Sequence, residues 1–65
     1  MSDRIIRKPE VLQKTGMTLS GLNRAQQNDL NFPKPIKLGE RAVGFSEREV
    51  DDYIQRVIEN RSIIY

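Results

Sequence analysis

The sequence predicts a mainly α fold in which three helices carry a small β-hairpin. Three observations lead to this fold class. Residues 9–28 form two short helical segments separated by a turn at Gly16, and residues 36–45 alternate as a β-hairpin does. A capping box that starts at Ser46 then begins a third helix. Two helices joined by a tight turn and followed by a hairpin predict a winged helix-turn-helix.

The N-terminal part is expected to contain a short strand and the two helices of the helix-turn-helix. Residues 5–6 are apolar and lie ahead of Pro9, which suits the first position of a helix. Gly16 favours the end of that helix near residue 15, because glycine readily adopts the left-handed conformation. Thr18 is expected to cap a second helix over residues 19–28.

The C-terminal part is expected to form the wing and the third helix. Two strands over residues 36–38 and 43–45 flank a turn at residues 39–41. The third helix has apolar residues at three- and four-residue spacing, and this face is expected to close the core as a lid: Val50, Tyr53, Ile54, Val57 and Ile58. We expect one domain over residues 1–61 and a C-terminal tail over residues 62–65, where the pattern stops.

Composition argues against an enzyme and against a metal or cofactor site. The chain has 65 residues with no cysteine and no histidine. It therefore lacks disulfides, the usual zinc ligands and the side chains on which most nucleophilic and acid–base catalysts depend. A domain this small also has little material to enclose a small-molecule substrate. We expect no catalytic activity, no cofactor and no small-molecule substrate.

Charge and hydropathy indicate a cytoplasmic protein that faces a polyanion. No apolar run is long enough to span a membrane, and the N-terminus lacks the apolar stretch of a signal peptide. Residues 1–45 carry eight Lys and Arg against four Asp and Glu, whereas residues 46–65 carry three against five. The basic part can face DNA while the acidic part points away. An ordinary solvated surface remains the alternative explanation of this asymmetry.

The second helix is expected to read DNA bases. Leu19, Leu22 and Ala25 are expected to pack inward, which leaves the other side chains free. The outward and flanking positions carry residues that match base edges in the major groove, and they are the predicted base-reading set: Ser20, Asn23, Arg24, Gln27 and Asn28. A helix that only faced solvent would favour Glu and Lys, and glycine or asparagine lowers helix stability.

A second set of residues is predicted to contact DNA phosphates without sequence preference. It consists of Lys8, Lys14, Thr18, Lys34, Lys37 and Arg41. Thr18 is a helix cap first and a phosphate ligand second, since free amides at a helix N-terminus also bind phosphate. The lysine of the hairpin, Lys37, has another possible role, because charged edge strands discourage the addition of further strands.

Several short motifs occur in the order and near the spacing of a known family. They are Arg4-Ile5-Ile6-Arg7, Glu10-Val11, Thr15-Gly16, Phe32-Pro33-Lys34-Pro35, Leu38-Gly39 and Arg41-Ala42-Val43-Gly44-Phe45. From residue 4 to about residue 58 the chain resembles the AlpA family of prophage regulators. The resemblance implies a winged-helix domain related to excisionases and MerR-type DNA-binding domains. It also implies a transcriptional regulator that controls prophage excision genes.

Three functions from different classes follow from the sequence. The first is a sequence-specific transcriptional regulator of a prophage or mobile element, which binds double-stranded DNA as a homo-oligomer. Oligomerisation is expected because a single module buries only about 600–1,000 Å² of protein surface on DNA. The second is an excisionase-type recombination directionality factor, which bends DNA at attachment sites. The third is a small protein-interaction module that uses the apolar tail Ile63-Ile64-Tyr65.

Overall fold

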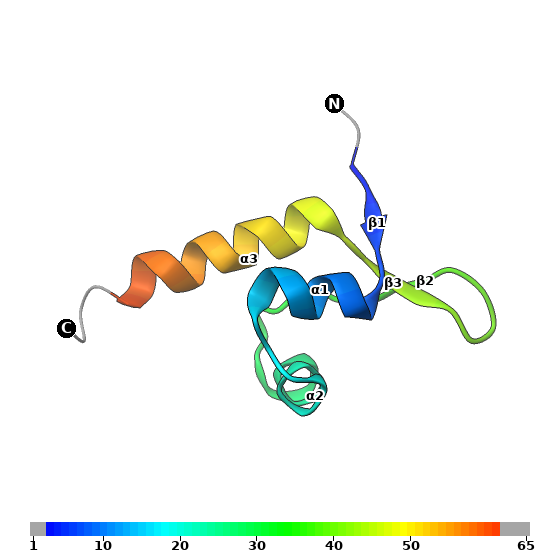
Figure 1. Ribbon diagram of the computed structural model, residues 1–65, viewed down its shortest axis with the longest axis horizontal. Coiled ribbons are helices and arrows are strands. Elements are labelled where there is room, and N and C mark those ends of the chain that lie inside the picture. The colour runs from blue at the N-terminus through cyan, green and yellow to red at the C-terminus, as the bar shows by residue number, and fades with distance from the viewer. Residues whose placement is uncertain (1–2, 62–65) are drawn as a thin grey trace.

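The structure is a computed structural model that describes residues 3–61 (Figure 1). Along the chain its elements are β1 (Ile5–Ile6), α1 (Lys8–Thr15), α2 (Leu19–Asn28), β2 (Ile36–Lys37), β3 (Val43–Ser46) and α3 (Glu47–Asn60). The arrangement confirms the predicted fold class, a mainly α winged helix-turn-helix with a small β-hairpin. The predicted tail at residues 62–65 lies outside the described residues.

The three strands form one antiparallel sheet in the order β1-β3-β2, so β3 is its central strand. Ile6 pairs with Phe45 across β1 and β3, and Lys37 pairs with Val43 across β2 and β3. At Gly44 a side chain does not fit without movement of the neighbouring strand, because a Cβ atom would clash with the Ile5 side chain and would lie 3.1 Å from the Ile6 carbonyl oxygen. The predicted short N-terminal strand, β1, therefore pairs with strand β3 of the hairpin and ties the N-terminal segment to the wing.

Local capping sets the ends of α1 and α2. The Arg7 carbonyl accepts hydrogen bonds from the amides of residues 10 and 11 at 3.0 and 3.1 Å, so α1 begins at Lys8 and not at the predicted Pro9. Gly16 ends α1 with a φ of 75°, as predicted. The Thr18 hydroxyl accepts a hydrogen bond from the Gly21 amide at 3.0 Å and thereby caps α2, also as predicted.

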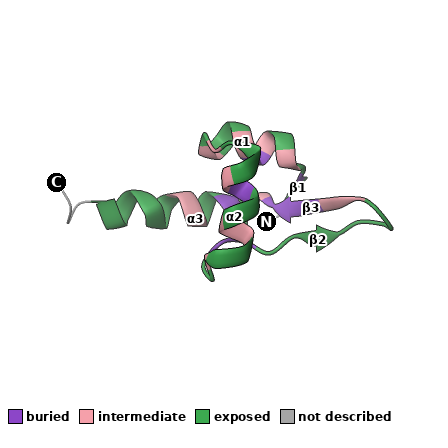
Figure 2. Cartoon of the chain, turned by 90° about the horizontal axis from the view of Figure 1, so that it is seen from below, coloured by how far each residue is buried: buried purple, intermediate pink, exposed green. Residues whose placement is uncertain are grey.

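A small core joins the helices to the sheet. Within residues 3–61, the hydrophobic core is formed by six buried side chains: Ile6, Val11, Leu22, Phe32, Phe45 and Val50. Figure 2 shows the burial concentrated where α2, β3 and the start of α3 meet. The Phe32 ring lies edge-on to Phe45 and Tyr53, with centroid distances of 6.2 and 4.8 Å. These contacts fasten the segment after α2 to both the sheet and α3.

The predicted apolar face of α3 closes the core only over its first half. Val50 is 1% exposed and Tyr53 and Ile54 pack against the core, but Val57 and Ile58 are 51% and 41% exposed. The prediction that all five residues form a lid is therefore wrong for the last two. The rest of the domain does not reach them, because the second half of α3 extends beyond α1 and α2 (Figure 1).

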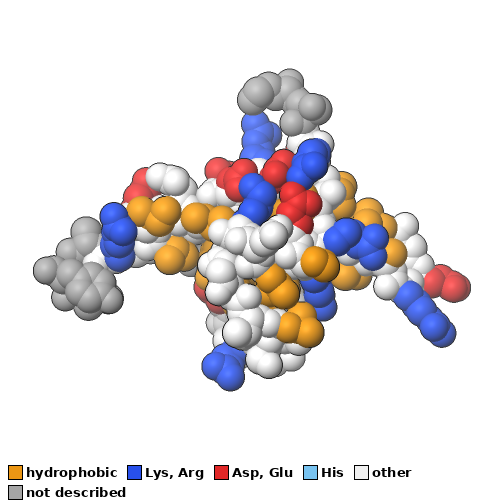
Figure 3. Space-filling view, viewed as in Figure 1, with side chains coloured by type: hydrophobic (Ala, Val, Ile, Leu, Met, Phe, Trp, Pro, Cys, Tyr) orange, Lys and Arg blue, Asp and Glu red, His pale blue; other side chains and the backbone are white. Residues whose placement is uncertain are grey.

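An ion-pair network joins β1, α1 and the start of α3. Glu47 accepts from Arg4 Nε at 3.1 Å and lies 3.2 Å from Lys14 Nζ, which also binds Asp51 at 2.9 Å. Arg4 pairs with Glu10 as well. The hydrogen bonds from Arg4 and then Lys14 lower the pKa of Glu47. Figure 3 shows these opposite charges intermixed where the three elements meet.

The N-terminal end of α3 is also held by Asp3. The Ser46 hydroxyl donates to the Asp3 carboxylate and accepts a hydrogen bond from the Glu49 amide at 3.2 Å, which confirms the predicted cap. The Arg48 amide donates to Asp3 at 3.1 Å. The bond from Ser46, followed by the bond from Arg48, lowers the pKa of Asp3. Asp3 and Glu47 therefore both stabilise the fold in their charged forms.

Acidification is expected to destabilise the fold from about pH 5 downward. Asp3 and Glu47 have lower pKa values in the folded chain than in the unfolded chain. Their contribution to the free energy of unfolding is therefore complete at any pH above their pKa values in the unfolded chain. It is lost as the pH falls through the folded pKa values, because the unfolded chain takes up protons first. Urea midpoints at pH 7 and pH 3 should fall further for the wild type than for the Asp3→Asn, Glu47→Gln double variant. An equal fall would contradict this assignment.

Candidate nucleic-acid interface

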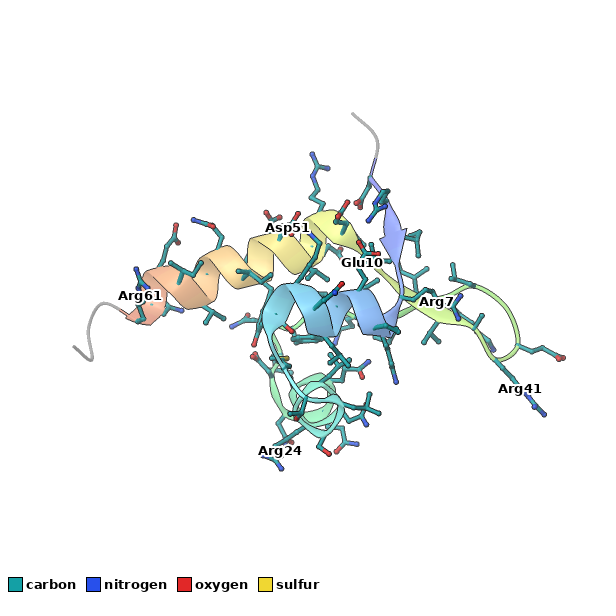
Figure 4. The ribbon with its side chains drawn as sticks, viewed as in Figure 1. Arg7, Glu10, Arg24, Arg41, Asp51 and Arg61 are labelled. Carbon is teal, nitrogen blue, oxygen red and sulfur yellow. The ribbon has the colours of Figure 1, made fainter. Side chains whose placement is uncertain are left out.

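The predicted base-reading residues lie on the outward side of α2. Ser20, Asn23, Arg24, Gln27 and Asn28 are all exposed, whereas the opposite side of the helix packs against the core. Figure 4 shows Arg24 pointing away from the body of the domain. The structure thus brings the five side chains together on one accessible helix surface. Their contact with bases stays a prediction.

One expectation about α2 is wrong, because Leu19 does not pack inward. Leu22 is fully buried and Ala25 packs against the core, but Leu19 is 52% exposed. Each residue turns an α-helix by about 100°, so the direction midway between Leu22 and Ala25 lies about 90° from Leu19. Leu19 therefore lies beside the outward face at the N-terminal end of α2, and it adds an apolar side chain to the candidate interface.

The C-terminal end of α2 is fixed by contacts that the sequence pattern did not reveal. The Asp29 amide donates to the Ala25 carbonyl at 2.9 Å, and the Tyr53 hydroxyl donates to Asp29 Oδ2 at 2.9 Å. Burial, followed by the hydrogen bond to Asp29, raises the pKa of Tyr53. Tyr53 was predicted only as a core residue. Its hydroxyl links α3 to the residue that ends α2 and thereby helps to hold the outward face of α2 in place.

The wing supplies a second exposed basic surface. Lys34, Lys37 and Arg41 are exposed, and the Leu38 amide closes the hairpin by donating to the Ala42 carbonyl at 2.8 Å. In Figure 4, Arg24 and Arg41 both point to the lower side of the molecule, from α2 and from the tip of the wing. A single duplex along that side could meet both elements. The phosphate contacts themselves stay predictions.

The remaining members of the predicted phosphate set are placed differently. Lys8 is half-buried on the first turn of α1, and the Thr18 hydroxyl is engaged as the cap of α2. The Lys14 ammonium faces α3, where Asp51 and then Glu47 raise its pKa. Lys14 is thus not brought together with Arg24 and the wing, and its charge is already balanced by carboxylates.

Arg7 is an exposed cation that the sequence prediction left out. It lies between α1 and the wing, and within residues 3–61 no carboxylate pairs with it (Figure 4). The signal was present in Arg4-Ile5-Ile6-Arg7, where two arginines flank one short strand. The structure separates their roles, because Arg4 binds Glu10 and Glu47 while Arg7 faces solvent.

Neither a cluster of metal ligands nor a membrane-spanning helix is found in the described part of the chain. Residues 3–61 contain no group of three or more potential metal-ligating side chains. Among the helices described, none has the length and apolar character needed to cross a bilayer. The features that stand out are therefore the polar face of α2 and the basic wing.

Comparison with known proteins places the chain in a family. The family described as "Prophage CP4-57 regulatory protein (AlpA)" matches residues 4–58. The chain belongs to the AlpA family. This match confirms the resemblance that the motifs indicated over nearly the same residues.

A relative within the AlpA family matches along most of its length. It is the protein named DNA-binding transcriptional activator AlpA from Escherichia coli (strain K12), which is 36% identical over 58 residues. The match covers 82% of this chain and 83% of the relative. No solved structure matches the chain.

Proposed function

We propose that this AlpA-family chain is a sequence-specific DNA-binding regulator of transcription, encoded by a prophage or mobile element and acting in the cytoplasm. The observation that carries the proposal is the outward face of α2. It gathers Ser, Asn, Arg and Gln side chains on a helix that is capped by Thr18 and tied to α3 by Tyr53. The family membership and the name of the Escherichia coli relative support the same function.

In the proposed complex, α2 enters the major groove and its side chains read base edges. Arg24 can donate two hydrogen bonds to guanine, and Asn23 or Gln27 can pair in the same way with adenine. A preorganised helix matters because base readout depends on the direction of each donor and acceptor. The proposed role of the protein is binding alone, and no reaction or cofactor is assigned to it.

The wing and the basic residues beside α1 would contact the phosphate backbone. Lys34, Lys37 and Arg41 are exposed on or next to the wing, and Arg7 adds a fourth accessible cation. Such contacts raise affinity for every sequence and fix the register of the helix in the groove.

Salt is expected to weaken DNA binding strongly. If about five phosphates are neutralised, the logarithm of the association constant should fall with the logarithm of salt concentration with a slope of about −4 to −5. Fluorescence anisotropy of a labelled duplex between 50 and 300 mM KCl measures this slope. A slope near zero would contradict the assignment of the basic residues to phosphates.

The function itself is tested by selecting ligands from a pool of randomised DNA duplexes with the purified chain. A recovered consensus that competes far better than a scrambled duplex supports sequence-specific binding. Double-stranded RNA should compete poorly, because its deep and narrow major groove does not admit a recognition helix. Failure to enrich any sequence, with no mobility shift at low salt, would overturn the proposal and favour a protein-interaction module.

We propose that the targets are genes of excision or integration; the family description refers to a prophage regulatory protein and does not name its targets. An excisionase-type factor on the same scaffold would instead bind repeated sites in an attachment region and bend them. Footprinting on the prophage that encodes the chain separates the two functions. Protection confined to a promoter supports the regulator, whereas protection confined to an attachment site supports the directionality factor.

A further inference from the structure

The first residue of α2 presents an apolar side chain to solvent beside the predicted base-reading face. Leu19 is 52% exposed, although leucine is among the residue types that proteins most often bury. The other large apolar side chains that are exposed within residues 3–61 lie on the strands, on α3 or in the segments between elements. On α2 the core is contacted by Leu22 and Ala25 instead. Leu19 is therefore an apolar residue of α2 that the core does not use.

The backbone on both sides of Leu19 is held by hydrogen bonds. The Thr18 hydroxyl accepts from the Gly21 amide at 3.0 Å and thereby fixes the first turn of α2. Ahead of this cap, the Met17 amide donates to the Thr15 hydroxyl at 3.2 Å, and the Met17 side chain packs against the core. The side chain of Leu19 is thus presented from a defined position at the N-terminal end of the helix.

Among the predicted base-reading residues, Asn23 is the one closest to Leu19 in direction around α2. At about 100° per residue the two positions differ by about 40°, and Cβ atoms four residues apart on a helix are about 5–6 Å from each other. Both residues are exposed. A recognition helix places its N-terminal residues against base edges in the major groove. Because successive bases are about 3.4 Å apart, Leu19 would lie one or two base pairs from the pair that Asn23 reads.

The major groove carries an apolar group that Leu19 can contact, the C5-methyl of thymine. The polar side chains on α2 match other groups, since Arg donates to guanine and Asn or Gln pairs with adenine. Leucine offers no hydrogen bond. Against a donor or acceptor of another base it would remove a polar group from water without giving that group a partner. Against the thymine methyl, it removes apolar surface from water on both sides of the contact.

We propose that Leu19 is a specificity-determining residue that contacts the C5-methyl of a thymine, one or two base pairs from the pair read by Asn23. This inference rests on the proposed DNA-binding function and assigns a base to one position of the binding site. Burial of one methyl-sized group raises an association constant about fourfold. Leu19 would therefore favour thymine at that position by about this factor over the same base without its methyl group.

Deoxyuridine tests the contact, because it forms the same base pair as thymidine and lacks only the C5-methyl. Each thymidine of the selected duplex is replaced in turn, and affinities are measured by fluorescence anisotropy for the wild type and Leu19→Ala. The matched control is Leu38→Ala, which removes a leucine of similar exposure, 46%, from the wing. Titration in about 50 mM KCl keeps weak binding measurable, since phosphate contacts strengthen at low salt. Urea midpoints of both variants report whether the fold is kept.

At one thymidine, the wild type and Leu38→Ala are expected to bind the deoxyuridine duplex about fourfold more weakly. Leu19→Ala should bind the two duplexes equally, and Leu19→Met, which keeps an apolar side chain, should restore the difference. The base pair at which Asn23→Ala relaxes sequence preference should lie within two base pairs of this thymidine.

Two results would overturn the contact while the proposed function stands. The first is sequence-specific binding in which deoxyuridine has the same effect on Leu19→Ala as on the wild type at every position. The second is a consensus with no thymidine within two base pairs of the pair that depends on Asn23. If selection enriches no sequence at all, the proposed function fails, and the contact fails with it.

Discussion

Replacing Phe45 with alanine is expected to leave a large fraction of the protein unfolded at 25 °C. Phe45 is fully buried in the central strand, where it pairs with Ile6 and packs edge-on against Phe32. Truncation of a buried phenylalanine to alanine costs about 3–5 kcal/mol, because apolar contacts are lost and a cavity remains. A single core in a chain of this size supplies about as much net stability. The substitution should therefore remove nearly all of it.

Urea titration followed by far-ultraviolet circular dichroism measures this loss. Leu30→Ala is the control, because Leu30 is 90% exposed and its removal should change the free energy of unfolding by no more than about 0.5 kcal/mol. DNA binding should disappear with the fold in Phe45→Ala and persist in Leu30→Ala, provided that Leu30 lies outside the interface. Similar urea midpoints for the two variants would contradict the central position of Phe45 in the core.

Elements that depend on neighbouring residues were predictable from the sequence. Thr18 and Ser46 accept hydrogen bonds from amides three residues ahead, and Gly16 takes the left-handed conformation that ends α1. Such caps act within one turn of a helix, so the residues that form them are adjacent in the sequence. The grouping of the polar residues on one side of α2 was predictable for the same reason, since helical spacing places them together.

Features that depend on distant parts of the chain were not predictable in this way. Lys14 approaches Asp51, and Tyr53 approaches Asp29, only because the fold brings α1 and the end of α2 next to α3. The spacing of α3 correctly identified an apolar stripe but gave no information about how far the core extends along it. Leu19 shows the same effect on α2, where the neighbouring elements decide which apolar residue is covered.

The Arg24→Ala substitution is expected to weaken specific DNA binding by about 1–3 kcal/mol, or roughly 5- to 150-fold, and to relax preference at one base pair. Arg24 is exposed at the centre of the outward face of α2. Its removal should leave the urea midpoint unchanged or slightly higher, because alanine is the better helix former. Anisotropy titrations against the selected duplex and its single-base variants measure both affinity and preference.

Lys37→Ala distinguishes base readout by Arg24 from a general loss of positive charge. Lys37 is also an exposed cation, but it lies on the wing. Its replacement should weaken binding to all sequences alike and reduce the magnitude of the salt slope by about 1. If Arg24→Ala gives this same uniform weakening with unchanged sequence preference, Arg24 is a phosphate contact. Base reading would then pass to Ser20, Asn23 or Gln27, whose alanine variants would be measured on the same set of duplexes.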